Sequence, residues 1–95
     1  MPLFTFLLEF GGGTYVSQFR STSIDSAVRK CSAELVENRS LGAPRLREQL
    51  SIAIAAEKPI ALRGVRRVWC CSASVGNRFA LMNIVETSDL SRKKR

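Results

Sequence analysis

Apolar and polar residues alternate along two stretches near the start of the chain, and this alternation predicts two β-strands. In Leu3–Phe10 every even-numbered position is apolar, and Thr14–Arg20 alternates in a similar way. Between them lies Gly11-Gly12-Gly13, and glycine readily adopts the positive φ angles of a tight turn. The pattern therefore predicts a β-hairpin.

The spacing of apolar residues becomes helical after this hairpin. Thr22 and Asp25 fit a capping box, which marks the start of a helix. Apolar residues then recur on one helical face from Ile24 to Leu35, and we expect the helix to fade near Asn38.

A second helical pattern begins at Pro44, because proline suits the first turn of a helix, and ends before Pro59. One face carries four apolar residues, at Leu46, Leu50, Ala53 and Ile54. Alternate apolar residues over Leu50–Ala55 also fit a strand, but the helix is the favoured interpretation.

A second hairpin is predicted near the end of the chain. Val65–Val75 and Arg78–Glu86 flank Gly76-Asn77, a two-residue loop typical of tight hairpins. Such a loop determines which residues face each other. The expected pairs are Val75 with Arg78, Ala73 with Ala80, Cys71 with Met82, and Trp69 with Ile84.

The predicted fold class is therefore α+β, in the order β-β-α-α-β-β. We expect a four-stranded antiparallel sheet with two helices packed on one face. Residues 1–88 form a single domain in this prediction, and residues 89–95 form a flexible, basic C-terminal tail.

The second hairpin has two apolar faces, and two helices on one face of a sheet cover only that face. The expected core face carries Trp69, Cys71, Ala73, Ala80, Met82 and Ile84. The opposite face carries Val68, Phe79, Leu81 and Val85. Exposed apolar patches of this kind mark interfaces, which predicts a homodimer through this open sheet face. The alternative is that an irregular segment, Arg39–Pro44 or Glu57–Gly64, folds over it.

The residue types that carry most enzyme chemistry are scarce. The chain has no histidine, and its three cysteines, Cys31, Cys70 and Cys71, lack the spacing of a metal site. Cys70 lies nearest to Arg66 and Arg67, yet all three thiols are better explained as small apolar side chains. Gly11-Gly12-Gly13 lacks the lysine and the helix that follow a phosphate loop. We predict no catalytic residue, no cofactor and no metal.

Positive charge is concentrated in two places. The formal net charge is +7, but residues 91–95 carry four of the fifteen basic side chains. A second cluster comprises Arg63, Arg66 and Arg67. With Arg20, Arg78 and the tail residues these arginines form a candidate basic rim for anions or nucleic acid. The tail residues are Arg92, Lys93, Lys94 and Arg95.

The first third of the chain resembles, in outline, the HicB-type antitoxin fold, a hairpin followed by a helix. The corresponding stretches here are Thr5–Glu9, Thr14–Arg20 and Ile24–Leu35. The proline- and glycine-containing stretch of that family is replaced by Ser21-Thr22-Ser23, and the resemblance assigns no functional residue.

Free thiols and the lack of a secretory signal in Met1–Phe10 predict a cytoplasmic protein without a membrane partner. The predicted function is a non-enzymatic interaction module that self-associates through the open sheet face. The alternative is a nucleic-acid-binding or regulatory protein that uses the arginine cluster and the basic tail.

Overall fold

A computed structural model of the chain describes residues 1–87, so the predicted tail lies outside the described residues. The fold is α+β, with two α-helices and a five-stranded sheet in the described part of the chain. The elements in order are β1 (Leu3–Phe10), β2 (Gly13–Arg20), α1 (Ile24–Leu35), the short 3₁₀ helix η1 (Arg39–Leu41), α2 (Pro44–Ala56), β3 (Ile60–Ala61), β4 (Val68–Val75) and β5 (Arg78–Thr87).

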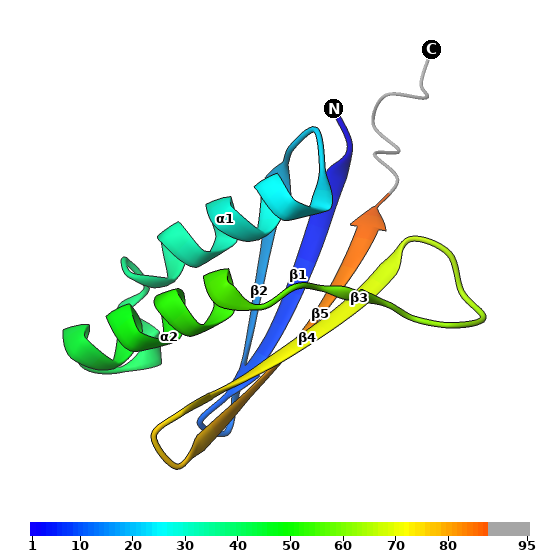
Figure 1. Cartoon of the computed structure of the whole chain (residues 1–95). Coiled ribbons are helices and arrows are strands. Elements are labelled where there is room, and N and C mark those ends of the chain that lie inside the picture. The colour runs from blue at the N-terminus through cyan, green and yellow to red at the C-terminus, as the bar shows by residue number, and fades with distance from the viewer. Residues whose placement is uncertain (88–95) are drawn as a thin grey trace.

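The sheet is antiparallel throughout, with the strand order β2-β1-β5-β4-β3 (Figure 1). The two hairpins meet in the middle, where β1 pairs with β5 and Phe6 lies opposite Ile84. The prediction of four strands was wrong by one. After Pro59 ends α2, the chain runs extended beside β4, and Ile60 pairs with Cys70 to form the edge strand β3.

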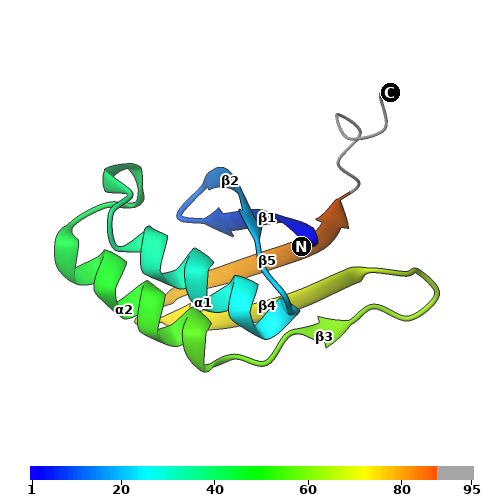
Figure 2. The same cartoon turned by 90° about the horizontal axis from the view of Figure 1, so that it is seen from above.

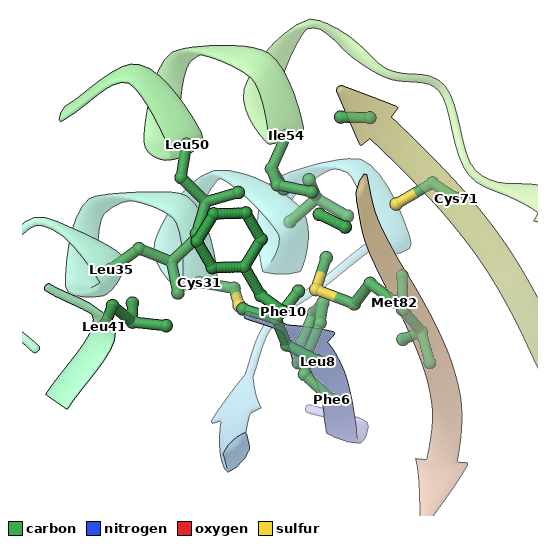
Figure 3. Packing of buried hydrophobic residues seen from close by; sticks show 14 of the residues in the cluster. Phe6, Leu8, Phe10, Cys31, Leu35, Leu41, Leu50, Ile54, Cys71 and Met82 are labelled. Atoms are coloured by element: carbon green, nitrogen blue, oxygen red, sulfur yellow. The ribbon is translucent and has the colours of Figure 1, made fainter. Parts of the chain in front are cut away.

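Both helices pack on the same face of the sheet, as Figure 2 shows from above. The core lies between the helices and the sheet, where side chains of β1, β4 and β5 meet those of α1 and α2 (Figure 3). Phe6, Leu50, Ile54, Met82 and Ile84 are fully buried there. The expected core face is confirmed, because its residues lie on this covered side and Trp69 packs edge-on against Phe4 at 5.9 Å between ring centroids.

The first hairpin turns through two glycines instead of three. Gly11 and Gly12 have φ angles of 59° and 84°, which glycine adopts at little cost. Gly13 already belongs to β2, opposite Phe10. The ring of Tyr15 lies where a side chain at position 13 would be, and its hydroxyl donates a hydrogen bond to the Ser40 carbonyl at 3.2 Å.

The helix starts are only partly as expected. The N-cap of α1 is Ser23 and not Thr22, because the Ser23 hydroxyl accepts a hydrogen bond from the Ser26 amide at 3.1 Å. Pro44 occupies the first turn of α2, as predicted. The alternative strand over Leu50–Ala55 is wrong, since these residues lie inside α2.

The predicted register of the second hairpin is confirmed at all four pairs, from Val75 opposite Arg78 to Trp69 opposite Ile84. The strand β4 begins at Val68 and not at Val65. The reason is local, because Arg67 has a φ angle of 62° and cannot continue an extended strand.

Candidate interaction surface

The face of the sheet that points away from the helices is here called the open face. Val68, Leu81 and Val85 lie on it and are partly exposed, and Phe79 is 60% exposed. All four residues proposed from the sequence therefore share this face. Leu7 on β1 lies between Val16 and Asn83, so the first hairpin continues the apolar surface across the sheet.

Three further apolar residues of this face were missed in the sequence. Val16 on β2 is 63% exposed, and Ile60 on β3 is 69% exposed. Leu62 follows β3, and its amide donates to the Val68 carbonyl at 2.9 Å, which places it beside β4 at the same edge. The alternation of Ile60 and Leu62 around one alanine is too short to indicate a strand without knowledge of its partner.

Most charged and polar side chains on the open face lie toward its ends, but Asn83 lies near its centre, between Leu7 on β1 and Cys70 on β4. Gln18 donates to the hydroxyl of Thr5 at 2.9 Å, and Thr5 in turn is hydrogen-bonded to Thr87, so a polar line crosses one end of the face. The only charged strand residues on this face, in the part of the chain described, are Glu9 and Arg20, near opposite ends of the first hairpin. Protein interfaces carry direct hydrogen bonds beside their apolar core, so one polar side chain such as Asn83 near the centre is compatible with an interface.

Neither of the two segments considered as covers lies over the open face. Residues 57–64 run along the edge of the sheet as β3 and the chain around it. Arg39–Leu41 pack beside α2 on the helical side, where Ser40 accepts the bond from Tyr15. Within residues 1–87, no segment covers this face (Figure 2).

The thiols divide between the two faces of the sheet. Cys31 and Cys71 lie in the core, and burial raises the pKa of the Cys31 thiol to about 12 and that of the Cys71 thiol to about 11. Both are therefore protonated near neutral pH and are poor nucleophiles. Cys70 lies on the open face opposite Asn83 and is partly exposed. Residues 1–87 contain no group of three or more candidate metal ligands.

Two of the surface hollows lie beside the helices. One of about 280 Å³, between the start of α1 and the end of α2, is lined by Asp25, Arg29, Glu57 and Lys58 among others. A second, of about 380 Å³, lies between β2 and the end of α1 and includes Glu34 and Glu37. No cysteine lines either hollow.

The predicted basic rim is not continuous. Arg63, Arg66 and Arg67 are exposed in the loop before β4, here called the arginine loop, which extends beyond one end of the sheet (Figure 1). Arg78 follows the β4–β5 turn and therefore lies at the opposite end, which contradicts its place in the rim. Arg20 lies at the same end as the loop but on the far edge strand. Arg92, Lys93, Lys94 and Arg95 lie outside the described residues.

A scan against protein-family models, a search of curated proteins and a search of solved structures each found no match to this chain. No helix within residues 1–87 has the length and apolar character needed to cross a bilayer.

Proposed function

We propose that the protein is a non-enzymatic interaction module that forms a homodimer through the open face. The observation that carries this proposal is a mainly apolar centre, with Asn83 but no charged side chain, on the uncovered side of the sheet. A sheet face that is solvated in the finished protein normally carries polar residues. This face carries Leu7, Leu81 and Val85 along its two central strands.

A second copy of the chain suits this face on electrostatic grounds. The chain carries a formal net charge of +7, so two copies repel each other over most orientations. Apposed open faces avoid this repulsion at their centre, because the charged strand residues that this face carries within residues 1–87, Glu9 and Arg20, lie near the ends. A two-fold arrangement also buries the same apolar patch on both copies.

The size of the open face also supports a second copy of the chain as its partner. Four strands of eight or more residues give a flat footprint of about 27 by 19 Å, or about 500 Å², before the relief of the side chains is added. Stable interfaces begin near about 600 Å² of accessible surface per partner. A domain of this size also gains stability from apolar burial in an oligomer.

Light scattering after size exclusion tests the proposal directly. At tens of micromolar we expect a mass twice the 10.5 kDa of one chain. Leu7→Arg places one cation per copy near the centre of the interface, where Leu7 lies between Val16 and Asn83, and should give a monomer. The matched control is Ile52→Arg, because Ile52 is 70% exposed on α2, away from the open face. A monomeric wild type would contradict the proposal.

Cys70 offers a second measurement that needs no substitution. It is the only partly exposed cysteine in residues 1–87 and lies on the open face. In a dimer its alkylation by iodoacetamide should slow as protein concentration rises, and Leu7→Arg should remove that dependence. A rate that is independent of concentration in the wild type would show that the open face stays uncovered.

A further inference from the structure

We propose that the arginine loop binds the phosphate backbone of a nucleic-acid duplex without selecting its sequence. This inference concerns a different surface from the open face and does not require the dimer. It starts from how charge is divided along the chain. Residues 1–57 contain six basic and six acidic side chains, whereas residues 58–87 contain five basic side chains and one acidic side chain, Glu86.

The net positive charge of the described chain therefore comes from residues 58–87. No carboxylate occurs between Glu57 and Glu86. Three of the five basic residues, Arg63, Arg66 and Arg67, lie in the loop and are exposed. Among the described residues, none of these three guanidinium groups has a hydrogen-bond or ion-pair partner. Arginine binds phosphate with several donors in one plane, so three unpaired arginines in five residues suit a polyphosphate ligand.

Both ends of the loop are held by backbone hydrogen bonds. The Leu62 amide donates to the Val68 carbonyl at 2.9 Å, and the Glu86 amide donates to the Arg67 carbonyl at 2.9 Å. The second bond ties the loop to β5, a central strand of the sheet. The arginines are thus displayed from an anchored base beyond the end of the sheet (Figure 1), which lowers the entropy lost when they bind.

The surroundings of the loop favour a duplex over a single strand. Single-strand binding sites combine cations with exposed aromatic rings that stack on bases. The aromatic residue nearest in sequence is Trp69, whose ring packs against Phe4 on the covered face. Without such a ring the contacts are limited to phosphates, which a duplex presents in regular rows irrespective of sequence.

A lipid surface fits the loop less well. Interfacial binding depends on apolar area inserted among the acyl chains, in addition to charge. Two aliphatic residues of the loop are exposed, Leu62 at 40% and Val65 at 56%. Leu62 lies where the loop leaves the edge of the sheet beside β4, so Val65 is the only one among residues 63–67. The guanidinium groups are therefore the main binding feature of the loop.

The test is a salt titration of the full chain against a fluorescently labelled 20-base-pair DNA duplex, followed by anisotropy. The matched variants are R63Q/R66Q/R67Q in the loop and R39Q/R45Q/R78Q. Arg39, Arg45 and Arg78 are all exposed, and their substitution removes the same charge as the loop variant. They lie toward the opposite end of the molecule from the arginine loop. Both variants retain residues 91–95, so any contribution of that segment is common to them.

Loss of three phosphate contacts should reduce the slope of log affinity against log salt by about 2.7. At 50 mM salt we expect the loop variant to lose at least tenfold in affinity and the control variant less than threefold. Arg66→Gln alone should reduce the slope by about 0.9. Its thermal unfolding is measured beside the wild type to show that the fold is retained.

Four results would overturn the inference. The first is no duplex binding by the wild type at 50 mM salt, and the second is an equal loss in the two triple variants. The third is tighter, loop-dependent binding to phosphatidylserine vesicles than to the duplex, which would assign the loop to a membrane surface. Stronger binding to the single strand than to the duplex would also contradict it, because no exposed ring of the loop supplies stacking.

Discussion

The two faces of the sheet are built from the same strands but are completed differently. On β5, Met82 is fully buried under the helices, whereas its neighbour Leu81 is only partly buried on the open face. The covered face is filled by α1 and α2, which supply residues such as Leu50 and Ile54. The open face also carries apolar residues, Leu7 and Val85 among them, but they surround the polar Asn83 and have no such cover, so alternation alone does not distinguish a core from an interface.

The largest expected difference is between truncations on the two faces. Met82→Ala should lower the free energy of unfolding by about 2–5 kcal/mol, since it leaves a cavity in a packed core. Leu81→Ala should cost about 1 kcal/mol or less where the monomer dominates, and more as protein concentration rises. Urea denaturation at two protein concentrations measures the loss of unfolding free energy for both variants. Equal losses at low concentration would mean that the open face is as well packed as the core.

Alkaline pH should act on the covered face through its thiols. Cys31 and Cys71 have pKa values of about 12 and 11 in the folded chain, raised by burial from the ordinary value of 9.0. The folded state therefore holds these protons more tightly than the unfolded state. Their contribution to stability is present below pH 9 and is lost as pH rises through 11–12.

Each thiol should contribute a fall of about 1.4 kcal/mol per pH unit between the ordinary pKa of 9.0 and its own folded pKa. Thermal unfolding between pH 8 and pH 11 measures the combined slope. Cys31→Ala should make the profile shallower, whereas Cys70→Ala on the open face serves as the matched control. An unchanged slope in the Cys31 variant would contradict the burial of that thiol.

A smaller effect on stability is expected at the N-terminus of α1. Ser23→Ala should destabilise the protein by about 1 kcal/mol, because the Ser26 amide loses its hydrogen-bond acceptor. Thr22→Ala is the control, since Thr22 precedes the cap and should change stability by less than about 0.5 kcal/mol. The melting temperatures of the two variants compare them. A larger loss of stability for Thr22→Ala than for Ser23→Ala would instead support Thr22 as the N-cap, as the sequence predicted.

The smallest effect tests whether exposure alone defines an interface. Ile52→Ser, on the outer side of α2, should change stability by less than about 0.5 kcal/mol and should leave the dimer mass unchanged. Leu7→Ser on the open face should weaken the dimer instead. Light scattering over a dilution series compares them. Dissociation caused by Ile52→Ser would move the interface to the helical side.

The parts of the fold that depend on neighbouring residues were predictable from the sequence. Gly76-Asn77 determined the register of β4 and β5, because a two-residue turn leaves only one pairing of the flanking strands. Pro44 marked the start of α2 for an equally local reason. The cap of α1 was misplaced by one residue, since Thr22 and Ser23 are both acceptable N-caps and the choice depends on how the chain leaves β2.

The remaining features depend on residues distant in sequence. The strand β3 exists because Ile60 and Ala61 find β4 beside them, and two residues carry no periodicity of their own. The four open-face residues of the second hairpin followed from its turn. The contribution of Leu7 and Val16 to one continuous surface required the pairing of β1 with β5, which no local pattern reveals.

The pairing of β1 with β5 has a consequence for synthesis. Leu3 lies opposite Thr87, so the central seam of the sheet joins the earliest strand to the latest. On the ribosome, the first hairpin and both helices emerge with one side of β1 unpaired, and the seam closes only after β5 has followed. Folding that waits on such distant contacts is slow, and we expect the nascent chain to hold an exposed apolar strand edge until translation has passed β5.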